Sequence, residues 1–158
     1  MCLAYFSRIS LSSYSKVKYI SYPSSLLLYL SLPLRYRLLR AISSNDLPSI
    51  KQLLDEGYDP NSIIDYKYGF TPLSLAAHLN QPELLEYLLL RGALIDKKDG
   101  CERTALERAV GNFNLESLKM LMDRGAEMGK AELIARFKGF KSGESILKKG
   151  GKGKSFPK

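Results

Sequence analysis

Apolar and polar residues alternate at helical spacing through the middle of the chain, in short segments that come in pairs. Apolar residues at positions i, i+3 and i+4 share one face of a helix, so each segment is predicted to be a short amphipathic helix. Such short helices are marginal alone in water and persist only when they pack against neighbours. In the three pairs, the apolar faces hold Leu38, Leu39, Ala41 and Ile42 with Ile50, Leu53 and Leu54; Leu73, Ala76 and Ala77 with Leu84, Leu85, Leu88 and Leu89; and Leu106, Ala109 and Val110 with Leu115, Leu118, Leu121 and Met122.

Residues that begin and end helices flank these segments. Asp46 and Thr71 can act as N-caps by accepting a backbone hydrogen bond. Pro48 and Pro72 stand in the first turn, where the missing N–H costs nothing. Glycines, which readily take the left-handed conformation that ends a helix, follow the second segment of each pair: Gly57, Gly92 and Gly125.

The paired segments repeat at a spacing of 33 to 35 residues. Thr71–Ala77 aligns with Thr104–Val110, and Arg91–Ala93 aligns with Arg124–Ala126, in both cases 33 residues later. A fixed period of this length indicates stacked units that share one core. We therefore look for a binding surface rather than an active site.

These residues resemble the ankyrin repeat, which has a period of 33 residues and the hallmark T-P-L-H-x-A. The second unit reads T-P-L-S-L-A over residues 71–76. The resemblance covers about residues 36–129, or three repeats, and is weakest at residues 36–38, where Y-R-L replaces T-P-L. It implies an all-α fold, an ankyrin-type α-solenoid of stacked helix-turn-helix repeats with short hairpin loops.

Two features depart from the repeat pattern. Ser74 and Glu107 occupy the place of the hallmark histidine, so we expect the hydrogen bonds of that histidine to be lost and the stack to be of modest stability. The loop at residues 63–70 carries two residues more than a strict period, which predicts a longer hairpin tip.

The predicted domain limits follow from these patterns. Residues 1–35 form a basic, Ser/Leu-rich leader that we expect to be poorly ordered. A mitochondrial-type presequence and a start codon placed too far upstream are alternatives for it. The chain is alternatively a fragment of a longer repeat array. The other limits are an ankyrin repeat domain at 36–138, with repeats at about 36–65, 66–98 and 99–130 and a capping helix at 131–138, then a disordered Lys/Gly-rich tail at 139–158.

Charge is distributed unevenly along the chain, whose net charge is +8. Residues 1–40 carry six basic and no acidic residues, and residues 130–158 carry nine basic and two acidic. Residues 41–129 carry nine basic and fourteen acidic, so the repeat region is mildly acidic between two basic ends. The two cysteines, Cys2 and Cys101, fit a reducing compartment. This predicts a cytoplasmic protein, with nucleus and mitochondrion as alternatives.

Patterns that would support catalysis are weak. Residues 150–155 end in Gly-Lys-Ser, like a phosphate-binding loop, but Lys148 stands where that motif needs its first glycine. His78, the single histidine, shows no candidate partner for base catalysis. We predict no catalytic, metal or cofactor site and no small-molecule substrate, and the chain is not expected to be an enzyme.

The resemblance implies a concave surface made by the first helix of each repeat and the hairpin tips. Tyr68 and Phe70 are the foremost contact candidates, because exposed aromatic side chains on a preformed tip are typical of hot spots. The alternative for Phe70 is that its ring folds back onto its own repeat; for His78 it is plain solvent exposure. The predicted partner-binding residues are Lys67, Tyr68, Phe70, His78, Leu79, Cys101, Arg103 and Asn112, with Gly100, Gly111, Ser43 and Ser44 at equivalent places.

The sequence thus predicts a protein–protein interaction module, or scaffold, that binds another protein of unknown identity. The alternative is an adaptor that contacts nucleic acid or an anionic membrane through its basic ends, with weak polyanion contact by residues 139–158.

Overall fold

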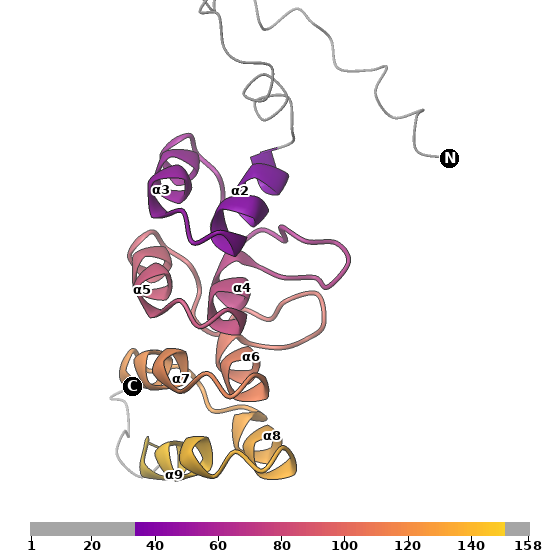
Figure 1. Ribbon diagram of the computed structural model, residues 1–158, viewed down its shortest axis with the longest axis vertical. Coiled ribbons are helices and arrows are strands. Elements are labelled where there is room, and N and C mark those ends of the chain that lie inside the picture. Colours follow the sequence, from indigo (N-terminus) through magenta and orange to yellow (C-terminus); the bar gives the residue numbers. More distant parts are fainter. Residues whose placement is uncertain (1–33, 151–158) are drawn as a thin grey trace, which may run out of the picture. The chain divides into compact units, whose positions relative to one another are not determined.

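The computed structural model describes residues 34–150, which form eight helices and, within that range, no strand. The helices come in consecutive antiparallel pairs, as the apolar pattern predicts (Figure 1). Their bounds are α2 Leu34–Ser43, α3 Leu47–Asp55, α4 Pro72–His78, α5 Pro82–Leu90, α6 Ala105–Gly111, α7 Leu115–Asp123, α8 Ala131–Phe137 and α9 Lys141–Gly150.

The pairs stack into two columns (Figure 1). Helices α2, α4, α6 and α8 follow one another in an inner column, and α3, α5, α7 and α9 form an outer column. The long loops that lead into α4 and α6 project from the inner column, away from the outer one. The all-α solenoid expected from the resemblance is therefore present.

One apolar core runs through all the pairs. Leu73 and Leu106, one period apart, are both buried and occupy equivalent layers. Ala76 and Ala109 are fully buried between inner helices, where their small side chains allow close approach. The short helices persist because each buries its apolar face against the next pair.

The predicted helix starts are present. Thr71 accepts from the Ser74 N–H while the Ser74 hydroxyl accepts from the Thr71 N–H, so the two form a capping box. Thr104 caps α6 in the same way at the Glu107 N–H, and Asp46 accepts from the Ser49 N–H. The predicted caps Asp46 and Thr71 thus locate two of the helix starts to the residue, and Thr104 repeats the Thr71 cap one period later.

The first hairpin is longer than the second, as predicted. In the first, the Ile64 N–H donates to the Phe70 carbonyl at 2.8 Å; in the second, the Asp99 N–H donates to the Arg103 carbonyl at 2.9 Å. The first hairpin therefore has two more residues between its hydrogen-bonded ends than the second. We call residues 64–70 tip 1 and residues 99–103 tip 2.

The sequence prediction is wrong about residues 141–150. They form α9, which completes a fourth helix pair with α8, instead of belonging to a disordered tail. Leu147 and Phe140 are buried, and a Cβ on Gly143 would lie 2.3 Å from the Phe140 ring. Gly143 makes room for the Phe140 ring, whereas the Lys/Gly-rich composition of the segment predicted disorder.

A recurring turn identifies α8 and α9 as a fourth unit of the same kind. The second residue after the inner helix adopts a left-handed conformation in every pair, at Asn45 (φ 54°), Asn80 (φ 56°), Phe113 (φ 62°) and Gly139 (φ 70°). A bulky residue rarely does so, and the Phe113 ring lies edge-on against Phe140, with 5.3 Å between centroids. Packing by the fourth pair therefore favours the turn of the third.

Some predictions lie partly or wholly outside the described residues. The leader at 1–35 overlaps the structure only at Leu34 and Arg35, which already belong to α2. The possible phosphate loop and the end of the tail, residues 151–158, lie beyond it. Between residues 34 and 150, no helix has the length and apolarity needed to cross a bilayer.

Candidate functional site

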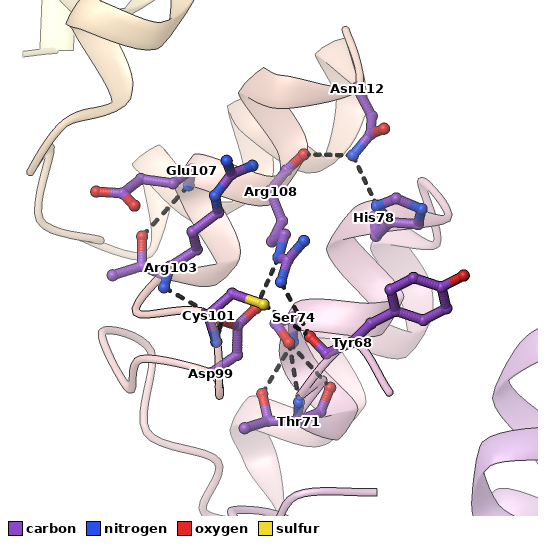
Figure 2. A network of polar contacts seen from close by, with 11 residues as sticks. Tyr68, Thr71, Ser74, His78, Asp99, Cys101, Arg103, Glu107, Arg108 and Asn112 are labelled. Atoms are coloured by element: carbon purple, nitrogen blue, oxygen red, sulfur yellow. Dashed lines mark hydrogen bonds and ion pairs between the residues drawn. The ribbon is translucent and has the colours of Figure 1, made fainter. Parts of the chain in front are cut away.

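The candidate surface is the inner side of the stack, made of the exposed side chains of the inner column together with tips 1 and 2 (Figure 1). Two long-range contacts define it. The tips lie against each other, and a network of polar contacts joins them to α4 and α6 (Figure 2).

Asp99, at the base of tip 2, is the centre of this network. Its side chain is 0% exposed. One carboxylate oxygen accepts from the backbone N–H groups of Cys101, at 2.8 Å, and Arg103, at 3.2 Å. The other accepts from Arg108 Nε at 2.6 Å. A buried carboxylate with three such donors fixes both the shape of tip 2 and the direction of Arg108.

Arg108, on α6, carries the network across to tip 1. Its Nη2 donates to the Tyr68 carbonyl at 3.3 Å, and its guanidinium carbon lies 4.4 Å from the centroid of the Phe70 ring. The Cys101 thiol donates to the same Tyr68 carbonyl at 3.2 Å. One arginine thus ties the helix of one repeat to the tip of the previous one (Figure 2).

The two tips touch through glycine. The Gly100 N–H donates to the Gly69 carbonyl at 2.7 Å. A Cβ on Gly69 would lie 2.5 Å from the Gly100 Cα, and Gly69 has a φ of +69°. Only glycine satisfies both the close approach and the left-handed conformation at this position.

His78 and Asn112 continue the surface along the inner helices. The two side chains meet at 2.8 Å between His78 Nδ1 and Asn112 Nδ2. Because an amide nitrogen only donates, Nδ1 accepts and the imidazole is neutral. Burial, followed by the positive charge of Arg108, lowers the pKa of His78, which favours the same neutral form.

The structure decides between the two predictions for Phe70. Its side chain is only 6% exposed, with its ring 6.1 Å from that of Tyr68 and 5.1 Å from that of His78. The expectation of an exposed contact is wrong, and folding back is confirmed. The buried Phe70 ring packs beneath Tyr68 and beside His78.

The other predicted residues lie on the surface. Tyr68 is 51% and Leu79 40% exposed, His78 is half-buried, and Lys67 has its Nζ 5.0 Å from the Tyr68 ring. A hydrogen bond with the Tyr68 side chain raises the pKa of Lys67. Contact with a partner stays a prediction for all of them. The remaining exposed members are Cys101, Arg103, Asn112, Gly100, Ser43 and Ser44, whereas Gly111 is buried.

Sequence reasoning missed Asp99 and Arg108. Asp99 directly precedes Gly100 at a predicted turn, a place where aspartate often binds nearby backbone N–H groups. Nothing in the sequence pairs it with Arg108. Ser74 and Glu107, which stand in the place of the hallmark histidine, make hydrogen bonds of their own, and the modest stability expected from their presence stays a prediction. Ser74 completes the capping box, and Glu107 accepts from the Lys130 N–H at 2.9 Å.

The described residues offer little that could carry a reaction. Within residues 34–150, no group of three His, Cys, Asp or Glu side chains gathers in a way that could hold a metal ion. Asp99 and Arg108 are occupied with each other and with backbone groups. The arrangement is that of a rigid support for exposed side chains.

Comparison with known proteins agrees with this architecture. The family model for ankyrin repeats, in three copies, matches residues 38–131. An ankyrin repeat protein of Fowlpox virus (strain NVSL) is 34% identical over 90 residues, which cover 56% of this chain and 26% of that protein. The mouse ankyrin repeat, SAM and basic leucine zipper domain-containing protein 1 is 32% identical over 100 residues, which cover 58% of this chain and 20% of that protein.

A longer match extends beyond the three repeats. An ankyrin repeat protein of Rickettsia bellii (strain RML369-C) is 27% identical over 135 residues, covering 71% of this chain and 56% of that protein. The chain thus spans between about a fifth and about half of the length of these relatives. With its stacked helix pairs and the match over residues 38–131, the chain belongs to the ankyrin repeat family.

Proposed function

We propose that this chain binds a partner protein through the inner side of its stack. Ankyrin repeats are generally protein–protein interaction modules and typically not enzymes. The observation that supports this surface is the pair of exposed apolar side chains, Tyr68 and Leu79, on a support whose polar groups are already satisfied.

The rigidity of the support favours binding. Tyr68 has its carbonyl held by Arg108 and Cys101, and its ring lies beside the buried ring of Phe70. An anchor that is already positioned loses little conformational freedom on binding. Aromatic anchors of this kind dominate many protein interfaces.

Affinity capture with the full chain tests the proposal. We expect Tyr68→Ala combined with Leu79→Ala to abolish recovery of the captured protein, and to weaken its binding by more than about 2 kcal/mol in calorimetry with the purified partner. The matched control is Leu90→Ala with Leu94→Ala, which removes two exposed apolar side chains (74% and 60% exposed) outside the inner side. Equal affinity of the wild type and the Tyr68/Leu79 variant would exclude the inner side.

A further inference from the structure

We propose that the segment bound on the inner side is an acidic stretch of the partner protein, with apolar residues among its carboxylates. The proposal rests on the proposed function and adds the chemistry of the ligand. It follows from how charges are paired in different parts of the stack.

Five exposed cations of the inner side form no salt bridge with an acid among the described residues. Two lie on α2, one on each tip, and one directly after α8. Among residues 34–150, none of the five has a carboxylate oxygen within 4.0 Å. The five are Arg35, Arg40, Lys67, Arg103 and Lys138.

Their placement follows from contacts and from the repeat. The Arg35 guanidinium lies 4.2 Å from the ring centroid of Tyr66 in tip 1. Arg40 occupies in the first repeat the place that Arg108 has in the third. Lys138 Nζ donates to the Gly111 carbonyl at 2.9 Å, at the end of α6.

Acids on the same side are already engaged. Asp99 is buried against Arg108, and Glu107 is buried with its Oε1 on the Lys130 N–H. Asp65 accepts from the Lys67 N–H at 2.8 Å, and Glu102 pairs with Lys98. Asp65 and Glu107 accept only from backbone N–H groups, so they still offset part of the positive charge. With Arg108 and Lys98 included, cations nevertheless outnumber these four acids on the inner side, although residues 41–129 hold more acids than bases.

The outer column has a more even balance of cations and acids, and it includes the exposed lysines Lys51 and Lys119. Its arginines pair with acids of the preceding repeat: Arg91 with Asp55 at 2.5 Å and Arg124 with Glu86. Exposed acids remain besides, at Glu83, Glu116 and Asp123. Coulomb attraction therefore favours the inner side over the outer column for an acidic segment.

Apolar side chains stand among the inner cations. Tyr66 is 73% exposed, and Tyr68 and Leu79 lie further along the same side. A peptide that alternates carboxylates with apolar residues would satisfy both kinds of group. A long polyanion such as a nucleic acid would also lie against the acidic residues elsewhere in the repeats, and these would repel it. A short acidic peptide avoids this repulsion and therefore fits better.

Fluorescence anisotropy on the full chain tests the inference. The probe is a labelled synthetic peptide rich in glutamate, with interspersed leucine and tyrosine. Its twin carries glutamine at every glutamate, and a single-stranded DNA oligonucleotide is the third ligand. The protein variants are Arg40→Gln with Arg103→Gln, and the matched control Lys51→Gln with Lys119→Gln on the outer column. Both variants keep residues 151–158, so a contribution of that basic stretch cancels.

We expect the acidic peptide to bind at least about tenfold more tightly than its twin, with affinity falling as salt is added. The Arg40/Arg103 variant should lose about tenfold and the Lys51/Lys119 variant less than about twofold. Equal binding of the two peptides, or equal losses in the two variants, would overturn the inference. Tighter binding of the DNA than of the acidic peptide, lost in the Arg40/Arg103 variant, would overturn the choice of a peptide.

The inference and the proposed function fail separately. One outcome is that the Tyr68/Leu79 variant loses the captured partner while the acidic peptide binds no better than its twin. In that case the binding surface is supported, and only the acidic character of the ligand is wrong. If capture is unaffected in that variant, the surface itself is wrong.

Discussion

On the inner side, the Asp99–Arg108 pair is buried and also forms hydrogen bonds with backbone groups of both hairpin tips. In the outer column, the Asp55–Arg91 and Glu86–Arg124 pairs are exposed and join side chains alone. The outer pairs link consecutive repeats directly, whereas the inner pair lies within the third repeat and reaches the second through the hydrogen bond from Arg108 to the Tyr68 carbonyl. A buried pair is strongly destabilising to break, because it leaves an unpaired charge out of water, while an exposed pair contributes little. We conclude that the inner pair positions the hairpin tips of the proposed binding surface and that the outer pairs mainly neutralise charge.

Removal of the Asp99 carboxylate should have the largest effect. Asp99→Ala leaves Arg108 and the N–H groups of Cys101 and Arg103 without their acceptor, which should cost about 3–5 kcal/mol of the free energy of unfolding. Urea denaturation followed by circular dichroism measures this loss. Asp99→Asn keeps the shape of the side chain and one of its two acceptor oxygens, so it should lower the free energy of unfolding by less than Asp99→Ala. A loss under about 1 kcal/mol for both variants would show that the pair does not support the tips.

A methyl group between the tips should have the next largest effect. Gly69→Ala forces a Cβ to within 2.5 Å of the Gly100 backbone at a φ of +69°, and we expect a loss of about 2–3 kcal/mol of stability. Gly92→Ala is the matched control, because its φ is +89° and no atom lies within 4 Å of the added Cβ. It should lose only about 1 kcal/mol. If the two variants lose equal stability, contact between the tips contributes nothing.

The exposed ion pairs of the outer column should contribute less to the free energy of unfolding. Asp55→Asn and Glu86→Gln should each lower the free energy of unfolding by about 0–1 kcal/mol, and the loss should shrink as salt is added. Urea denaturation at low and high ionic strength checks both statements. A loss as large as that of Asp99→Ala would remove the contrast between the two sides.

The titration of His78 should have the smallest effect. Its pKa is lowered in the folded chain from an ordinary value of 6.5, mainly by burial, so the unfolded chain binds the proton more readily. Stability should therefore be complete above the unfolded value and decline as the pH falls through it toward the lowered folded value. His78→Gln should flatten this dependence in denaturation curves between pH 7 and pH 5. A steeper decline in the variant would contradict the neutral imidazole.

Much of the stack could be predicted because its determinants are local. Leu73 and Leu106, the Thr71 and Thr104 caps and the extra residues of tip 1 are all visible as spacing or residue type. Each of these features is set within one repeat, and the repeat copies it. A periodic sequence therefore reveals the fold with little knowledge of long-range contacts.

The rest depends on contacts between distant residues. Gly143 lies in α9, where the Phe140 ring occupies the space that a Cβ would need, whereas composition alone indicates a flexible tail. Arg108 meets Asp99 only after the tip folds onto α6. Phe70 could equally point outward until its carbonyl closes the hairpin with Ile64. None of these contacts has a signature in spacing.

An NMR titration of the ¹⁵N-labelled full chain with the glutamate-rich peptide tests the central claim most directly. We predict that amide shifts change in tips 1 and 2 and along α2, α4 and α6, and that those of α3, α5 and α7 stay in place. Shift changes concentrated on the outer helices, with the tips unaffected, would contradict it.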